Sequence, residues 1–228
     1  MAIGRHWEWR GFGSLSAAFR ERFESLRHAQ TDHKPFDLVD YYLWVPGYGV
    51  NAKLRSGLAT GDCLKLKRLR ARWSQLQLWH EDPEDIYNLP LGPADLSWLA
   101  DELHIKLPAN DRGARDFDEA LDVLTTATPA VQVIEVHKQR DVRVWEDAKS
   151  KVIVEIAELT KPEVISSLCL ESTIELNELS RPQELSAARD SVQRAVDDLG
   201  VSHESLQSLN YVDALTIWST GELLHNVL

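Results

Sequence analysis

The chain is poor in cysteine and has no long apolar run. Its 228 residues include two cysteines, Cys63 and Cys169, which are too few and too isolated for a zinc site or a disulfide framework. Every apolar run is broken by a charge well short of the ~18 residues that a membrane span needs. The opening residues MAIGRHWEWRGFG contain no apolar core of the kind that signal peptides have. We therefore expect a cytoplasmic protein that does not contact a membrane.

Basic residues are outnumbered by acidic ones. The chain has 25 lysines and arginines against 36 aspartates and glutamates, a net charge of −11. A surface of this sign disfavours binding to nucleic acid polymers and to anionic membranes. With 43% hydrophobic and 27% charged residues the composition is that of a folded globular protein. We find no internal repeat and no linker, so we predict one domain over 1–228, with a loop-helix insertion at about 80–116.

Alternating and helical patterns together predict an α+β fold with a mainly antiparallel sheet. In the first segment, Trp7 and Trp9 alternate with polar residues, which is typical of a half-buried strand. Strands are predicted over 5–10, 37–45, 50–55, 63–69, 71–79, 130–138, 139–145, 151–159 and 168–178. Helices are predicted over 14–27, from Pro93 onward, and over 117–127, 180–200 and 210–224.

Basic residues recur at every second position in several of these strands, which places each set on one face. The sets are Lys53/Arg55, Lys65/Lys67, Arg68/Arg70/Arg72 and Lys138/Arg140. For any single set, the solvated face of an ordinary strand is the better interpretation. If the four faces converge, their like charges repel one another unless an anion lies between them. Such a surface suits a small polyphosphate, because guanidinium and ammonium groups form charge-assisted hydrogen bonds with phosphate oxygens.

A magnesium-dependent phosphate site would also need inward-facing carboxylates, because Mg²⁺ prefers oxygen ligands. Candidates lie on the first strand and on the last two predicted strands. They are Glu8, Glu155 or Glu158, and Glu171 or Glu175. Glu8, between two tryptophans, is the best placed, whereas for Glu158 and Glu178 an exposed strand position is the better interpretation.

The order of short motifs resembles a known family. The motifs are, in order, Asp40-Tyr41-Tyr42, Lys53-Leu54-Arg55, Lys65 to Arg68, Val136-x-Lys138-x-Arg140, Val154 to Leu159, Thr173 to Leu179 and Asn210 to Leu215. From Arg5 to Trp218 this order is similar to that of the CYTH superfamily, the triphosphate tunnel metalloenzymes. Each motif is short, so the resemblance depends on their order.

The resemblance implies an eight-stranded closed antiparallel β tunnel with helices packed outside and ligand-binding side chains inside. The phosphate-binding residues it implies are Arg10, Lys53, Arg55, Lys65, Lys67, Lys138 and Arg140. The implied ligands of a divalent ion, Mg²⁺ or Mn²⁺, are Glu8, Glu155 and Glu175. The tryptophans of the strands would then pack between the tunnel wall and the outer helices. These are Trp7, Trp9, Trp44, Trp79 and Trp145.

Two positions depart from the family pattern E-x-E-x-K and from its later glutamate pair. The first motif is His6-x-Glu8-x-Arg10, and the second is Glu175-x-Asn177, so each has lost one carboxylate. Fewer anionic ligands weaken the binding of a hard cation. Two hypotheses therefore stay open. One is a metal-dependent phosphohydrolase acting on inorganic triphosphate, thiamine triphosphate or a nucleoside triphosphate. The other is a non-catalytic CYTH-like protein that binds polyphosphate or an organic anion. The expected partner is a small anionic phosphate ligand. Adenylate cyclase activity has less support, and the sequence leaves the oligomeric state open.

Overall fold

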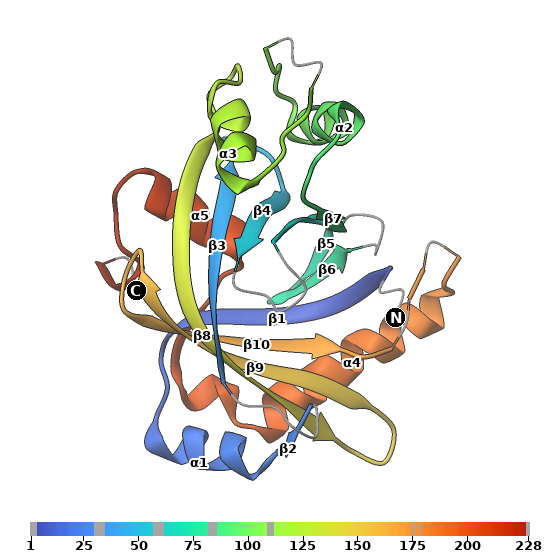
Figure 1. Cartoon of the computed structure of the whole chain (residues 1–228). Helices are drawn as coiled ribbons and strands as arrows, with labels where there is room; N and C mark the ends of the chain where they lie inside the picture. Colours follow the sequence, from blue (N-terminus) through green and yellow to red (C-terminus); the bar gives the residue numbers. More distant parts are fainter. Residues whose placement is uncertain are drawn as a thin grey trace.

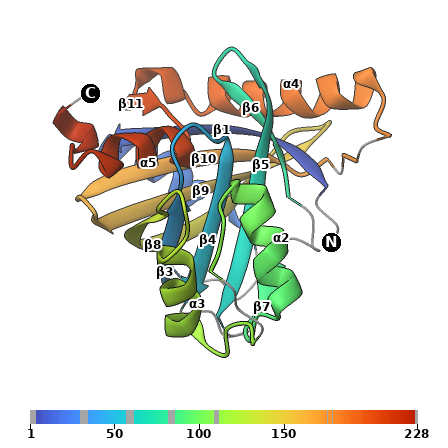
Figure 2. The ribbon, with the colours of Figure 1, turned by 90° about the horizontal axis from the view of Figure 1, so that it is seen from above.

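The structure is a computed structural model that describes residues 4–29, 35–56, 62–81, 86–108, 112–174, 176, 177 and 179–226. Within these residues, eight antiparallel strands close into a barrel. Figures 1 and 2 show how the strands are arranged in space. Around the barrel they are β1 (Arg5–Ser14), β6 (Leu76–His80), β5 (Cys63–Trp73), β4 (Val50–Ser56), β3 (Phe36–Trp44), β8 (Gln132–Glu146), β9 (Lys151–Lys161) and β10 (Ile165–Ser172). Pairing of β10 with β1 closes the ring, which confirms the predicted α+β fold with a closed antiparallel tunnel.

Short strands and helices cover the outside of the barrel. The short strands are β2 (Arg27–His28), β7 (Ile86–Asn88) and β11 (Ser205–Ser208). The helices are α1 (Ala17–Ser25), α2 (Pro93–Leu103), α3 (Phe117–Thr125), α4 (Pro182–Asp198) and α5 (Tyr211–Ser219), with 3₁₀ turns η2 (Val201–His203) and η3 (Leu224–Asn226). None of these described helices is long and apolar enough to cross a membrane.

The apolar core lies between the outer face of the barrel and the helices. One cluster joins α1 and α4 to β1, β9 and β10, and a second joins α2 and α3 to β3, β4 and β5. Figure 1 shows these two groups on different sides of the barrel, with α5 beside the strands on a third side. Because helices cover the outer face, the alternate side chains are left to fill the lumen.

Strand β1 shows this division most clearly. Trp7 and Trp9 point outward into the cluster beneath α4, as predicted. His6, Glu8 and Arg10 point inward and are nevertheless buried, with 1%, 3% and 7% of their surfaces exposed. A strand with both faces buried and charges on one of them needs partners for those charges inside the barrel.

Several predicted strand boundaries are wrong. The segment 71–79 is not one strand, because the chain turns after Trp73 and Ser74 adopts a left-handed backbone with a φ of 52°. The strands predicted over 130–138 and 139–145 form the single strand β8. The last barrel strand ends at Ser172 instead of continuing to 178. One tryptophan is also misplaced: Trp79 is aligned with His6 and faces the lumen, because the turn after Trp73 resets the alternation.

The predicted insertion at about 80–116 contains β7 and α2 in its described part. Strand β7 pairs with β5 and so extends the sheet at one edge. Helix α2 begins at Pro93 as predicted, and its Leu96, Leu99 and Leu103 are buried against the barrel. This helix therefore belongs to the wall that shields the outer face of β4 and β5.

Candidate functional site

All seven basic residues predicted to bind phosphate line one cavity inside the barrel. The cavity has a volume of about 220 Å³. Its bases come from four strands, β1, β4, β5 and β8, and are Arg10, Lys53, Arg55, Lys65, Lys67, Lys138 and Arg140. Four carboxylates, Glu8, Glu81, Glu155 and Glu171, line the same cavity. Cations therefore predominate on the lining of a protein whose overall charge is negative.

The strand register explains why these side chains converge. Lys53 of β4 is aligned with Lys65 of β5 on one side and with Tyr42 of β3 on the other. Residues aligned across antiparallel strands point to the same face, so one inward residue fixes the direction of its neighbours. Like charges at directly aligned positions repel, and Lys53 and Lys65 are therefore held in place by other groups.

Asp40 of β3 is the main counter-ion on one side of the cavity. Its carboxylate is fully buried and lies 2.6 Å from Nε of Arg55, 2.6 Å from Nζ of Lys138 and 3.2 Å from Nζ of Lys53. Burial alone would raise the pKa of Asp40, but Lys138, Lys53 and Arg55 outweigh it and hold the pKa well below its usual range. Asp40 thus stays ionised and binds three cations together.

Lys53 responds differently to the same surroundings. Its ammonium is buried, lies 3.4 Å from the hydroxyl of Tyr42 and sits 5.0 Å from the centre of that ring. Burial lowers the pKa of Lys53 well below its usual range, and the charge of Arg55 lowers it further, against the opposite effect of Asp40. An additional anion nearby would favour the charged form of this amine.

Two further ion pairs lie in the barrel, one within β1 and one between β8 and β9. Nε of Arg10 donates to Glu8 at 2.8 Å, and its Nη1 donates to Oγ of Ser167 at 3.0 Å. Arg140 pairs with Glu155. Burial opposes ionisation of Glu155, but the positive charges of Arg140 and Arg10 lower its pKa to about 2. Glu155 is therefore engaged with arginine side chains.

A third group contains the donors that could hold a divalent cation. The ligand atoms of His6, Glu8 and Glu171 all lie within 4.8 Å of one another. Carboxylate oxygens and an imidazole nitrogen are suitable in chemical type for Mn²⁺ and similar ions. Nζ of Lys67 lies 3.7 Å from a Glu8 oxygen and 3.8 Å from a Glu171 oxygen, so these donors fit a metal only if the ammonium moves. Of the other predicted ligands, Glu155 lies in the cavity beside Arg140, and Glu175 lies outside the described residues.

Aromatic side chains form one boundary of the lumen. Asn210 caps α5 by accepting from the amide of Asp213, which starts the helix at the barrel end and turns Tyr211 inward. Tyr211 stacks on Tyr42 with 5.0 Å between ring centres. The guanidinium of Arg10 lies 4.8 Å from the centre of the Tyr211 ring. Cation–π contacts of this kind keep a cation in place without neutralising it.

The remaining set at spacing two does not line the cavity. Arg68 pairs with Glu102 of α2, and Arg72 pairs with Asp213 of α5. The register between β5 and β6 shifts between Leu69 and Ala71, which marks a bulge. Arg68 directly follows Lys67, which lines the cavity, so strand alternation already places Arg68 on the opposite, outward face before the bulge is reached.

Comparisons with known proteins support the fold. No protein-family model matches the chain, and no curated protein matches it. A solved structure of a conserved hypothetical protein from Pyrococcus furiosus has a TM-score of 0.53 at 13% identity, covering 90% of this chain and 98% of that one. A "putative adenylate cyclase" from Bacillus halodurans has a TM-score of 0.45 at 11% identity, covering 91% of this chain and 95% of that one. The first likeness shows that the fold occurs in a protein of nearly the same extent.

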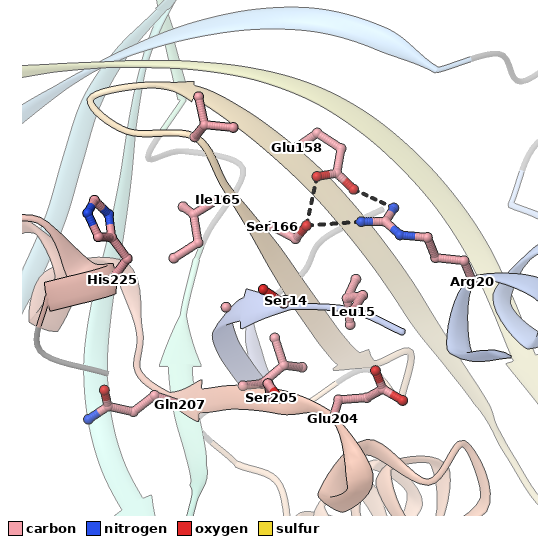
Figure 3. A pocket seen from close by; sticks show the side chains of 13 residues that line it. Ser14, Leu15, Arg20, Glu158, Ile165, Ser166, Glu204, Ser205, Gln207 and His225 are labelled. Carbon is pink, nitrogen blue, oxygen red and sulfur yellow. Dashed lines mark hydrogen bonds and ion pairs between the residues drawn. The ribbon is translucent and has the colours of Figure 1, made fainter. Parts of the chain in front are cut away.

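A larger hollow lies outside the barrel and differs in chemistry. It has a volume of about 900 Å³ and is bordered by α1, the β9–β10 hairpin and β11. Figure 3 shows that Arg20 points to Glu158 and Ser166, which already accept its hydrogen bonds. Two carboxylates, Glu158 and Glu204, line this hollow beside that single arginine. It therefore offers a phosphate chain far fewer donors than the cavity in the barrel does.

Three residues of the site fall within predicted motifs or elements without being predicted to line a cavity. They are Asp40 in its motif, Glu81 in the insertion and Tyr211 in the last helix. A fourth, Glu171, is the alternative to Glu175 that does line the cavity. An alternation count along β3 would have placed Asp40 and Tyr42 on one face. The role of Glu81, one residue beyond β6, has no such signal.

Proposed function

We propose that the barrel binds a small anion with several phosphate groups, above all a triphosphate, and that the chain is a CYTH-type protein. The observation that supports this best is the convergence of seven basic side chains from four strands on one cavity. Guanidinium and ammonium groups on rigid strands suit polyphosphate, because each can donate to a different oxygen. The CYTH-like order of motifs along a closed antiparallel barrel agrees with this proposal.

The size of the cavity favours a phosphate chain inside it. Pockets that enclose a whole organic ligand usually measure about 300–1,000 Å³. A cavity of about 220 Å³ is smaller, so a nucleoside or thiamine group would remain at the mouth while its phosphates enter. Inorganic triphosphate, thiamine triphosphate and nucleoside triphosphates are the candidate ligands. Cyclisation of a nucleotide is the weaker alternative, because it needs the ribose to be held as well. We also propose a cytoplasmic location, because the cysteines Cys63 and Cys169 are buried and unpaired.

Binding is tested by calorimetric titration of the full chain with tripolyphosphate in the presence of EDTA. We expect Lys138→Met to weaken binding by roughly tenfold or more, because a charge-assisted hydrogen bond contributes about 1.5–3 kcal/mol. Lys151→Met is the matched control, since the Lys151 side chain is 52% exposed and pairs with Glu146 outside the cavity. Absence of tripolyphosphate binding to the wild-type protein, or an equal loss in both variants, would contradict the proposal.

A second candidate function is metal-dependent hydrolysis of the bound triphosphate. It is favoured by the cluster of His6, Glu8 and Glu171 beside the phosphate-binding cations. A divalent ion there would neutralise phosphate charge and activate a water molecule. In this scheme Arg10 and Arg140 would hold phosphate oxygens while the cluster holds the ion. Burial opposes ionisation of Glu8, but Arg10 and Lys67 keep its pKa well below the usual range, so it is an anionic ligand at neutral pH.

Hydrolysis is tested by measuring phosphate release from tripolyphosphate with Mn²⁺ and with Mg²⁺. We expect release by the wild-type protein and a loss of at least roughly a hundredfold in Glu8→Gln, because the variant removes an anionic ligand. Calorimetry of the same variant checks that tripolyphosphate still binds. Binding without release under either metal would reject the enzyme and leave the binding protein.

A further inference from the structure

The ammonium group of Lys67 is surrounded by the donors that a divalent cation would use. Its Nζ lies 2.7 Å from a Glu81 oxygen and 3.3 Å from Nε2 of His6. It also lies 3.7 Å from a Glu8 oxygen and 3.8 Å from a Glu171 oxygen. Four side chains from three regions of the barrel thus converge on one positive charge.

The ammonium group of Lys67 thus occupies a site whose surrounding groups are typical of a metal-binding site. Three of the four groups, His6, Glu8 and Glu171, are the ones whose ligand atoms lie within 4.8 Å of one another. Two cations cannot share such a position, because their repulsion rises steeply at short distance in a poorly solvated cavity. We propose that Lys67 is a built-in cation that occupies the divalent-metal position of the barrel, so that a metal binds only when Lys67 is withdrawn, as it would be toward the oxygens of a bound phosphate chain.

The surroundings of Lys67 keep its ammonium charged and in place. Burial alone would lower the pKa of Lys67, but Glu81, Glu171 and Glu8 outweigh it and raise the pKa above its usual range. Glu81 lies closest and also binds Lys65, so it ties both lysines to the end of β6. Nε2 of His6, an atom that would otherwise be available to a metal, lies 3.3 Å from the ammonium of Lys67.

The inference also specifies which metal the site takes once Lys67 is gone. Imidazole nitrogen is a ligand for Mn²⁺ and Zn²⁺ more than for Mg²⁺, which prefers oxygen alone. His6 therefore makes the site more selective for Mn²⁺ over Mg²⁺. This inference concerns the same cavity as the proposed function, but it requires neither hydrolysis nor the presence of a phosphate ligand.

The test is titration of the full chain with Mn²⁺ alone, with free and bound Mn²⁺ measured by electron paramagnetic resonance. We expect weak binding to the wild-type protein and an affinity higher by roughly tenfold or more in Lys67→Met, because the variant frees the ligands and removes the repelling charge. Lys65→Met is the matched control. Lys65 lies in the same cavity and also pairs with Glu81, so this variant removes one positive charge from the same surroundings. A general effect of charge would therefore raise the Mn²⁺ affinity of both variants equally. We expect a change of less than about threefold there, and we expect Glu8→Gln to abolish the gain made by Lys67→Met.

Two outcomes would overturn the inference. One is equal Mn²⁺ affinity in Lys67→Met and Lys65→Met, in folded proteins checked by circular dichroism. The other needs no variant: binding of Mn²⁺ to the wild-type protein tighter than roughly 10 μM, without phosphate, would mean that Lys67 does not block the site. Failure of tripolyphosphate to bind in the calorimetric experiment would reject the proposed function but leave this comparison unchanged.

Discussion

Replacement of Asp40 by asparagine tests whether internal ion pairs hold the lumen together. The substitution preserves the shape of the side chain and removes its charge. The asparagine would no longer neutralise the charges of its three buried neighbours, Arg55, Lys138 and Lys53. Because Asp40 is fully buried, solvent cannot replace the lost anion.

The expected destabilisation follows from this burial. Removing one partner of a buried ion pair typically costs about 3–5 kcal/mol of unfolding free energy. In a chain of this size each kcal/mol lowers the melting temperature by about 2–4 °C, so Asp40→Asn should melt roughly 6–20 °C lower. The loss should be smaller with tripolyphosphate present, because the ligand would supply the missing negative charge. Asp40→Asn should therefore gain more stability from tripolyphosphate than the wild-type protein does.

The assay is thermal and urea unfolding with and without tripolyphosphate. Glu158→Gln is the matched control, because Glu158 also pairs with an arginine, Arg20, but its side chain is 41% exposed. An exposed pair contributes about 0–1 kcal/mol, so the control should unfold close to the wild type. Unfolding of Asp40→Asn within about 1 kcal/mol of the wild type, without ligand, would refute the role of Asp40 as the shared counter-ion.

Three further predictions concern stability in acid, a close backbone contact of a glycine and a hydrogen bond near the C-terminus. Glu155 has its pKa lowered from 4.5 to about 2, so its contribution to stability is present above pH 4.5 and is lost as the pH falls toward 2. Urea unfolding across this range should show a fall of about 3 kcal/mol from this group, which Glu155→Gln lacks. Gly13→Ala should lower the unfolding free energy by more than about 2 kcal/mol, because the added Cβ would lie 2.0 Å from the Ser205 carbonyl oxygen. In the control Gly49→Ala the added Cβ meets Leu69 at 3.7 Å, so the unfolding free energy should change by less than about 1 kcal/mol. Equal losses in the two variants would contradict this prediction. Glu163→Leu should speed hydrogen exchange of the Leu224 amide, which donates to Glu163 at 2.7 Å, because the variant removes the acceptor. Unchanged exchange would show that this bond does not fix the C-terminal turn.

The common face of each basic set was predictable from alternation, and the closed barrel was implied by the family resemblance. A strand covered by helices on one side must place its alternate residues in the lumen. Lys53 with Arg55, and Lys138 with Arg140, therefore enter the same cavity once their strands are recognised. This inference needs only the period of a strand and the closure of the sheet.

The partners of these cations were not predictable, because they depend on which residues are aligned across distant strands. Glu8 is aligned with Glu171, and Asp40 with Arg55, through the register of complete strands. The family resemblance implied Glu175 as a metal ligand, and that residue lies outside the described part of the chain, whereas Glu171 lies in the cavity. Sequence patterns predict which face of a strand a residue lies on. Which residue lies beside it on the next strand can be predicted only when the register of the two strands is known.

The pairing of the lumen cations also bears on which anions can bind. In the free protein Asp40, Glu155 and Glu81 already neutralise much of the positive charge, so an incoming anion must compete with carboxylates at short distance. A single phosphate or sulfate can replace only one or two of these contacts, and its gain is small because the lost pair and the new one are similar in strength. A chain of three phosphates can engage cations of several strands at once, and its later contacts form at high effective concentration. The internal carboxylates should therefore make the barrel selective for polyphosphate over monophosphate, and replacing Asp40 by asparagine should reduce that selectivity by strengthening monophosphate binding more than tripolyphosphate binding.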